Sequence, residues 1–225
     1  KVDAHMMKNT EWGAVAYLKQ SKYGLGTTVI GNNSYYGSST PRYKAGCGPA
    51  SETNLTSNTT TCTSYTSTAG VKSSTTGNIY GVYDMAGGAY ESVMGVIQDN
   101  TNTSTPMSGY STYYNSGFTG KVYADGNYTS YTGTVFPSSK YYDLYAFGET
   151  GDDSSAYEKR ILGDATSETR GWYSDYSTFA YAEYPWFERG GSALDGFGAG
   201  VFLALRSYGD PGGNISFRSV LALGA

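Results

Sequence analysis

Hydrophobic and polar positions alternate over only short stretches of this 225-residue chain, and one segment near its start has helical periodicity. The segment 9–18 reads NTEWGAVAYL, and the apolar positions on one helical face are Trp12, Val15 and Ala16. Thr10 is placed to cap the helix, and Glu11 suits the positive end of its dipole. Gly24 and Gly26 follow as stop signals. The pattern predicts a helix over these ten positions.

The remaining apolar positions predict short elements separated by polar loops. Residues 78–91 alternate apolar and polar side chains before a pair of glycines, and 140–145 and 171–175 have the pattern of further short strands or turns. Residues 31–78 are rich in Asn, Ser, Thr and Gly with almost no periodicity, which predicts an elaborated surface loop. The Thr-, Ser-, Tyr- and Asn-rich stretch 100–131 is expected to be irregular.

The composition agrees with a folded, loop-rich protein. Only 15% of the residues are charged, whereas 24 are tyrosine and 31 are glycine. So many aromatic residues argue against disorder, because disordered chains have few aromatics and high net charge. We therefore expect residues 1–225 to form a single folded, loop-rich domain.

Charge and hydropathy exclude two classes of partner. A net charge of −4 with scattered basic residues opposes a nucleic-acid role, because phosphate binding depends on clustered Lys and Arg. No run of about 18 apolar residues is present, so direct insertion into a membrane is not expected. The sequence begins Lys1-Val2-Asp3 without the apolar core of a signal peptide, which predicts that Lys1 starts a trimmed or mature fragment.

Cys47 and Cys62 are the only two cysteines, and both lie in the polar loop. We expect a disulfide between them; the alternative is a pair of free thiols. Two cysteines without a nearby histidine do not make a structural zinc site, which needs four nitrogen or sulfur ligands. A bridge would indicate an oxidising location such as a cell surface or virion.

Three blocks of the sequence resemble the formylglycine-generating-enzyme (sulfatase-modifying factor) type of the C-type lectin fold. Thr10-Glu11-Trp12 resembles the family's early Thr-Glu-x-Glu-Trp helix, and 78–91 resembles its Asn-x-Tyr-Gly-Leu-Tyr-Asp-Met-x-Gly-Asn-Val-Trp-Glu segment. Residues 189–192, Arg-Gly-Gly-Ser, and 217–218, Phe-Arg, resemble its closing strands. The resemblance implies an α+β C-type lectin fold with short antiparallel strands and few helices across nearly the whole chain. The alternative is an α+β domain without this relationship. The same branch contains the variable proteins of diversity-generating retroelements.

Departures from the family pattern oppose enzymatic activity. In the oxidase members a cysteine follows the Gly-Gly-Ser block by three residues and another follows five later, but Asp195 and Gly200 stand there in this chain. Without thiolates there is neither a nucleophile nor a soft copper ligand. His5 is the lone histidine, and no Ser/His/Asp arrangement includes it. We expect no catalytic residues.

The resemblance also bears on calcium. Family members often use the Asn and Glu of the middle block around a calcium ion, which prefers oxygen ligands. Gly88 replaces that Asn, and Tyr90 replaces the family's Trp. Glu91 remains as a candidate calcium ligand, and its alternative role is a buried, hydrogen-bonded carboxylate. No other cofactor is expected.

The C-terminal region 189–225 has the signature of a diversified surface. It holds no Glu, Lys, Gln, Met or Trp, the types that adenine-targeted mutagenesis of Asn codons cannot produce. The Tyr, Ser, Gly and Asn of the whole chain also dominate antibody combining sites. The candidate ligand contacts are Ala193, Leu194, Asp195, Phe197, Leu203, Leu205, Arg206, Tyr208, Asp210, Pro211 and Asn214.

Roles within this region follow from residue type. Phe197 and Tyr208 are expected as aromatic anchors, with Arg206 and Asp210 as the polar contacts that select a partner. The blocks that flank the contacts are assigned to the framework: Arg189, Gly190, Gly191, Phe217 and Arg218. Phe217 is expected to be buried, and Arg218 to be a buried, hydrogen-bonded structural residue. Alternatively, the tyrosine-rich strands build only the core of a weakly charged surface protein.

Together these patterns predict a non-enzymatic protein that binds a protein or carbohydrate ligand on a cell surface through its C-terminal region. Such a protein would be an adhesin or be associated with a phage tail, and it would lie outside the cell, on a bacterial surface or virion. A structural subunit or decoration of a bacterial filament is the first alternative. A diverged enzyme of the sulfatase-modifying type is the second.

Overall fold

The computed structural model describes eight stretches of the chain, which together make up most of it. These are residues 2–30, 46–53, 62–98, 119–124, 127–134, 138–148, 161–209 and 212–223. They combine one α-helix with several short strands and many turns, so the α+β, loop-rich class is confirmed. Within these stretches no helix has the length and apolar character needed to cross a bilayer.

The predicted N-terminal helix is present as α1 (Asn9–Gln20). Trp12 and Ala16 are fully buried on one face, as the periodicity predicts. The start differs from the prediction, because the N-cap is Lys8 and Thr10 lies inside the first turn. There the backbone N–H and the hydroxyl of Thr10 both donate to the carboxylate of Asp143. Tertiary contact has therefore moved Thr10 from the predicted cap to an anchor against the sheet.

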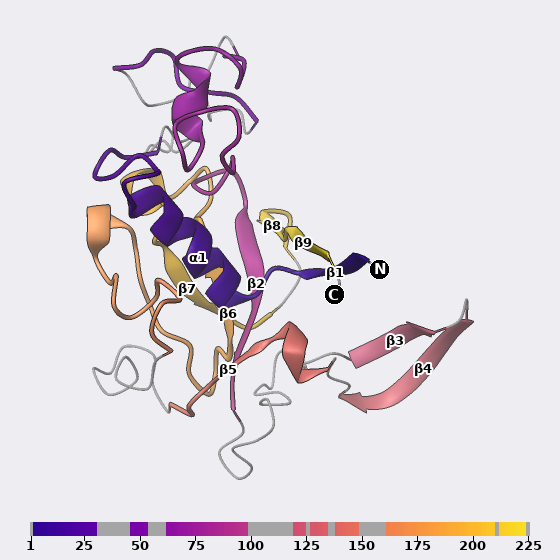
Figure 1. Ribbon diagram of the computed structural model, residues 1–225. Helices are drawn as coiled ribbons and strands as arrows, with labels where there is room; N and C mark the ends of the chain where they lie inside the picture. Colours follow the sequence, from indigo (N-terminus) through magenta and orange to yellow (C-terminus); the bar gives the residue numbers. More distant parts are fainter. Residues whose placement is uncertain are drawn as a thin grey trace.

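A five-stranded sheet forms the centre of the described molecule, and α1 lies against it (Figure 1). Its strands are β2 (Tyr90–Ile97), β5 (Asp143–Tyr145), β6 (Trp186–Arg189), β7 (Ala204–Ser207) and β8 (Ile215–Ser216). The order is β5-β2-β6-β7, with β8 also paired to β2. Strands β6 and β7 are antiparallel to their neighbours, whereas β5 and β8 run parallel to β2. The sheet is therefore mixed, and the expectation of antiparallel strands holds only for part of it.

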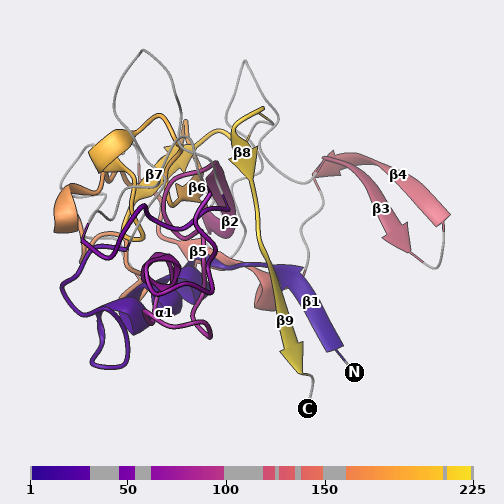
Figure 2. The same cartoon turned by 90° about the horizontal axis from the view of Figure 1, so that it is seen from above.

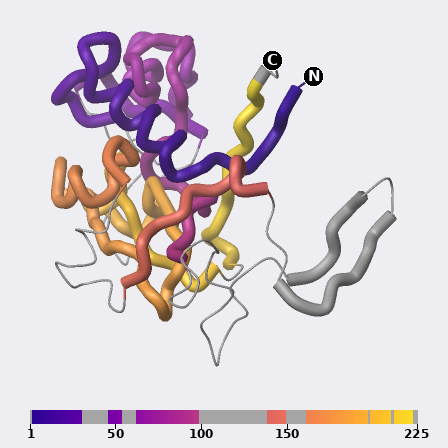
Figure 3. The backbone as a smooth tube through the Cα atoms, turned by 60° about the horizontal axis from the view of Figure 1, so that its bottom comes forward, coloured from indigo at the N-terminus to yellow at the C-terminus, as the bar shows by residue number. Residues whose placement is uncertain are grey.

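The two terminal strands, β1 (Val2–Met6) and β9 (Ser219–Leu223), pair with each other along their whole length. Figures 2 and 3 show them side by side, with the two chain ends adjacent. Of the two faces of this ribbon, the one that includes Val220 packs against the core. Val2 and Leu221, on the other face, are exposed. The pairing fixes the position of β9 and therefore of residues 217–218, which directly precede it.

Two sequence predictions about strands are wrong. The stretch 100–131 was predicted to be irregular, but it contains paired strands. β3 (Thr119–Ala124) and β4 (Asn127–Thr134) form an antiparallel hairpin. Residues 100–118 lie outside the described part. Residues 78–89 form turns, and strand structure begins only at Tyr90. Gly87 and Gly88 have φ of 75° and 78°, a conformation that ends the apolar–polar alternation in a turn.

Single 3-10 turns make up the remaining regular structure: Gly70–Ser73, Ser139–Tyr141, Trp172–Ser174 and Gly196–Gly198. The stretch 140–145, predicted as a strand or turn, is divided between the second of these turns and β5. The stretch 171–175 forms the third.

The predicted disulfide is present: Cys47 and Cys62 are bonded to each other. Beside the bridge, the N–H of Gly48 donates to the carbonyl of Thr63. The bridge therefore orders part of the long polar loop, whose segments 31–45 and 54–61 lie outside the described residues.

We expect the double substitution Cys47→Ser, Cys62→Ser to lower the free energy of unfolding by about 3 kcal/mol, because the bridge restricts a short loop in the unfolded chain. Urea unfolding of both proteins measures the difference. Alkylation of unreduced protein followed by intact mass analysis is the companion measurement. Two alkylated cysteines in the unreduced parent, or equal stabilities of parent and variant, would contradict the expectation.

Candidate functional site

The framework of the C-terminal region is assembled around the indole of Trp12. Trp12 is fully buried, and its ring N–H donates to the carbonyl of Val201 at 2.8 Å. The guanidinium groups of Arg189 and Arg218 lie 5.7 and 5.6 Å from its ring centre. Gly190 has a φ of 79°, and a Cβ there would lie 3.3 Å from the same ring. Blocks far apart in the sequence therefore meet at one side chain.

Arg218 joins the last block to the middle one through an ion pair with Glu91. Its Nε and one terminal nitrogen each lie 2.5 Å from a different oxygen of the carboxylate. The guanidinium also donates to the carbonyls of Tyr83 and Asp84. Because both oxygens of Glu91 accept from a cation of the chain itself, we assign Glu91 to the framework rather than to a calcium site. The described residues contain no group of three or more His, Cys, Asp or Glu that could hold a metal ion.

The prediction that Phe217 is buried is wrong. Its side chain is 63% exposed, whereas that of the neighbouring Arg218 is half-buried and fully hydrogen-bonded into the framework. The chain between β8 and β9 turns the arginine inward and the phenylalanine outward. Of this pair only Arg218 serves as framework.

Two of the predicted contacts, Arg206 in β7 and Tyr208 directly after it, form a compact group with Tyr181 and Tyr184. The rings of Tyr184 and Tyr208 are 3.8 Å apart between centres, and their hydroxyls are 2.5 Å apart. The guanidinium of Arg206 lies 5.0 Å from the ring centre of Tyr181 and 5.2 Å from that of Tyr184. We call these four residues the tyrosine–arginine cluster. All four side chains are half-buried, so each is packed and still presents part of its surface to solvent.

The cluster is held by backbone structure on both sides. Arg206 pairs with Phe187 in the β6–β7 register, and its backbone N–H donates to the hydroxyl of Thr178 at 3.1 Å. Tyr181 and Tyr184 close a tight turn through reciprocal backbone hydrogen bonds. A rigid strand and a short turn thus fix the four side chains, which lowers the entropy lost on binding.

The other predicted contacts are dispersed. Leu203 is fully buried, so its assignment as a ligand contact is wrong; it forms part of the core behind β7. Leu194 is 50% exposed and Asn214 is also exposed, whereas Ala193 and Leu205 are half-buried. Two predicted contacts, Asp210 and Pro211, and the side chain of Phe197 lie outside the described residues.

Asp195 has a structural role. Its carboxylate accepts from the hydroxyl of Tyr90 at 2.7 Å and from the backbone N–H of Ser192 at 2.6 Å. These bonds tie the turn after the Gly-Gly-Ser block to the start of β2. The carboxylate of Asp195 therefore serves to hold this turn in place.

Gly200 has no room for a side chain. A Cβ at Gly200 would overlap the carboxylate of Asp175, which is buried there and accepts the N–H of Phe202 at 2.9 Å. Burial raises the pKa of Asp175 to about 6. The acidic side chain fills the space that a cysteine side chain would need.

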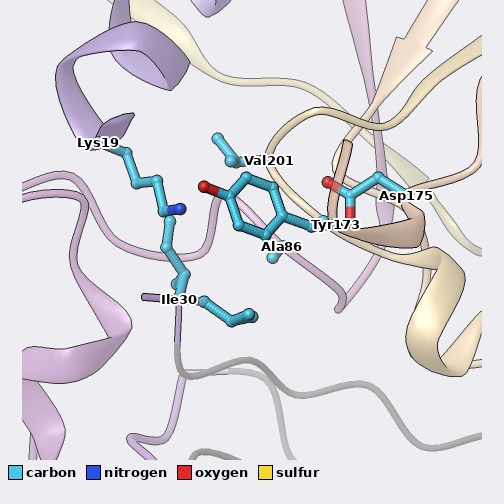
Figure 4. A pocket seen from close by; sticks show the side chains of 8 residues that line it. Lys19, Ile30, Ala86, Tyr173, Asp175 and Val201 are labelled. Atoms are coloured by element: carbon cyan, nitrogen blue, oxygen red, sulfur yellow. The ribbon is translucent and has the colours of Figure 1, made fainter. Parts of the chain in front are cut away.

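A cavity of about 20 Å³ lies beside Gly200, between Lys19, Tyr173 and Asp175 (Figure 4). That volume holds about one water molecule, so it does not admit a substrate. The ammonium of Lys19 lies 4.0 Å from the centre of the Tyr173 ring and donates to the carbonyl of Gly26. Lys19 is 1% exposed, and burial lowers its pKa to about 8.

This lysine predicts a pH dependence of stability. Between pH 8 and about 10 the unfolded chain keeps a proton on Lys19 that the folded protein releases, so the folded state gains stability as the pH rises through this range. We expect Lys19→Met to remove that gain, whereas the same change at the exposed Lys22 should preserve it. Urea-unfolding midpoints at pH 7, 8 and 9 measure the effect. Equal pH dependence in the parent protein and Lys19→Met would contradict the prediction.

Sequence analysis did not identify Tyr181 and Tyr184, which complete the cluster. A signal was present, because the two tyrosines flank a tight turn immediately before the Trp-Phe-Glu-Arg strand. The candidate contacts all lie after Arg189, so these two tyrosines, which precede it, were missed.

In comparisons with known proteins, no family model matches this chain and no curated protein matches it.

Proposed function

We propose that this protein is a non-enzymatic ligand-binding module with a C-type-lectin-like scaffold of the formylglycine-generating-enzyme type. Its recognition surface is the tyrosine–arginine cluster together with the exposed positions of the C-terminal region. Arg189 and Arg218 of the closing block lie against Trp12 of the first block, and Arg218 pairs with Glu91 of the middle block. These contacts support the scaffold, because they join the three blocks on which the family resemblance rests.

The observation that carries the binding role is the composition and packing of the cluster. Tyrosine and arginine are enriched among residues that dominate binding energy at protein interfaces. Here Arg206 lies over the rings of Tyr181 and Tyr184, and Tyr208 stacks on Tyr184. All four side chains remain partly accessible. A protein or carbohydrate on a cell surface or virion is the expected ligand, and the Cys47–Cys62 bridge is compatible with an oxidising compartment.

The oxidase alternative is disfavoured by what occupies the two thiol positions. Asp195 is bound to Tyr90 and Ser192, and Gly200 is covered by Asp175. Incubation of the protein with copper, oxygen and a sulfatase-motif peptide should leave the peptide's cysteine unchanged. Turnover above a metal-only control would overturn the non-enzymatic assignment.

Binding is tested with fluorescently labelled protein on a panel of intact bacterial cells. The triple variant Tyr184→Ala, Arg206→Ala, Tyr208→Ala should lose at least tenfold in affinity for any cell that the parent binds. A control variant with Tyr23→Ala, Lys22→Ala and Tyr80→Ala, three exposed positions outside the C-terminal region, should bind like the parent. Protease or periodate treatment of the cells separates protein from carbohydrate ligands. Equal binding by both variants would refute the site.

A filament subunit is the second candidate, and the terminal ribbon favours it. Val2 and Leu221 are 63% and 72% exposed on the same face of the β1–β9 pair, which is the kind of surface that assembly contacts cover. Assembly into polymers that Leu221→Asp abolishes would support this function. Genes for filament assembly beside the coding sequence would favour it, whereas a reverse transcriptase and a near-copy repeat would favour the binding module.

A further inference from the structure

A cavity of about 220 Å³ is lined in part by Trp186 and Gly209, which lie close to residues of the tyrosine–arginine cluster in the sequence. Its walls come from β1, β2, β6 and the chain after β7, and the lining residues are Met6, Ser92, Val93, Met94, Trp186, Phe187 and Gly209. Pockets for drug-sized ligands have volumes of roughly 300–1,000 Å³. This cavity is smaller, so it has room for a single ring or one side chain.

An irregularity in β2 creates the space. The register with β6 shifts between Val93 and Val96, which leaves Met94 and Gly95 outside the regular ladder. Met94 instead donates its N–H to the carbonyl of Met7, in the chain between β1 and α1. The ladder resumes at Val96, which pairs with Trp186. Irregularities of this kind are common near functional sites.

Gly209 forms the opposite wall. It has a φ of 82°, and a Cβ there would lie 2.8 Å from the indole of Trp186, so only glycine lets the backbone approach the ring. The N–H of Gly209 donates to the hydroxyl of Ser207 at 3.1 Å, which holds this turn in place. Trp186 is half-buried, and Phe187 and Val93 are 0% and 2% exposed. The cavity is therefore built from residues that the fold already fixes.

The chemistry of the lining selects the occupant. Five of the seven residues are apolar, and two of these are methionines, whose sulfur atoms make favourable contacts with aromatic rings. The side chain of Ser92 is the one hydroxyl of the lining. Burying a charge against such walls is costly, whereas a neutral ring with one polar group would satisfy both the walls and the hydroxyl.

Two lining residues are close neighbours of the cluster along the chain. Gly209 directly follows Tyr208, and Trp186 lies two residues after Tyr184, so the cluster and the cavity share two backbone segments. We infer that the cavity receives one aromatic side chain, tyrosine or tryptophan, of a protein partner that the cluster contacts. This inference rests on the proposed binding function and narrows the ligand class to protein.

The test uses 4-methylphenol and indole as probes of the two side chains, with protein labelled at its methionine methyl groups. In NMR titrations both probes should shift the signals of Met6 and Met94 saturably, while Met7 and Met85, buried in the core and outside the lining, should not move. Methyl β-glucoside should produce no shift. No saturable shift by either aromatic probe, equal shifts at all four methionines, or preferential binding of the glucoside would overturn the inference.

A filling variant provides the second arm. Ser92→Phe should weaken 4-methylphenol binding at least tenfold, whereas Ser138→Phe, at an exposed position outside the cavity, should leave it unchanged. Unchanged Met7 and Met85 signals verify that each variant is folded, and Ser92→Leu replaces the first variant if it is not. Probe binding that survives the filled cavity would also refute the site.

The two proposals fail differently. If the probes bind but substitution of the cluster leaves cell binding intact, the binding surface is wrong and the cavity stands. If the cluster is required for cell binding but the probes do not bind, the cavity inference alone is wrong.

Discussion

Arg218→Ala should lower the free energy of unfolding by about 3 kcal/mol, one of the largest effects expected of any single substitution in this chain. The change leaves the carboxylate of Glu91, an 8% exposed residue, without its cation, and it also removes the donors to the carbonyls of Tyr83 and Asp84. A buried carboxylate that loses its partner costs more than the pair itself contributes. Thermal unfolding should show a melting temperature lower by about 6–12 °C.

The neighbouring residue supplies the control. Phe217→Ala should change the free energy of unfolding by no more than about 0.5 kcal/mol, because the ring is 63% exposed. The variant Glu91→Gln, Arg218→Met tests the mechanism, since it removes both charges and should recover part of the loss. If Phe217→Ala is the more destabilising of the two alanine variants, then Phe217 rather than Arg218 is the residue that faces inward between β8 and β9.

The sequence was informative where local chemistry decides the outcome. The helix over 9–18 and the disulfide were predicted correctly, because periodicity and a pair of cysteines in one loop are local signals. The N-cap at Thr10 was predicted wrongly, because the backbone N–H and hydroxyl of Thr10 donate to Asp143, a residue distant in the sequence. A hydrogen bond to a distant residue leaves no signal in the local sequence.

The same distinction explains the candidate site. Residue type marked Arg206 and Tyr208 as candidate contacts, and the structure places both in one partly exposed group. Burial could not be read from residue type, so Leu203 was wrongly included and Phe217 was wrongly placed inside. Position in the fold decides these two cases, because Leu203 precedes β7 against the core and Phe217 lies between β8 and β9. The occupation of the Gly200 position by Asp175 was equally beyond sequence reasoning, since the two residues meet only in the fold.

Trp12→Ala should be at least as damaging as Arg218→Ala. Removing a fully buried indole typically costs about 3–5 kcal/mol, and here the carbonyl of Val201 also loses its donor. The resulting space would adjoin the guanidinium groups of both Arg189 and Arg218. For a domain with a stability of about 5–15 kcal/mol, such a loss threatens folding.

Two further tryptophan variants separate the causes. Trp12→Phe keeps most of the apolar volume but loses the hydrogen bond to Val201, so it should show an intermediate loss of about 1–3 kcal/mol in urea unfolding. Trp172→Ala, at a residue that is 39% exposed, should cost less than either change at Trp12. If Trp12→Ala unfolds at the same urea concentration as Trp172→Ala, then Trp12 does not organise the framework. The first and closing blocks would then lack a common anchor beneath the recognition surface.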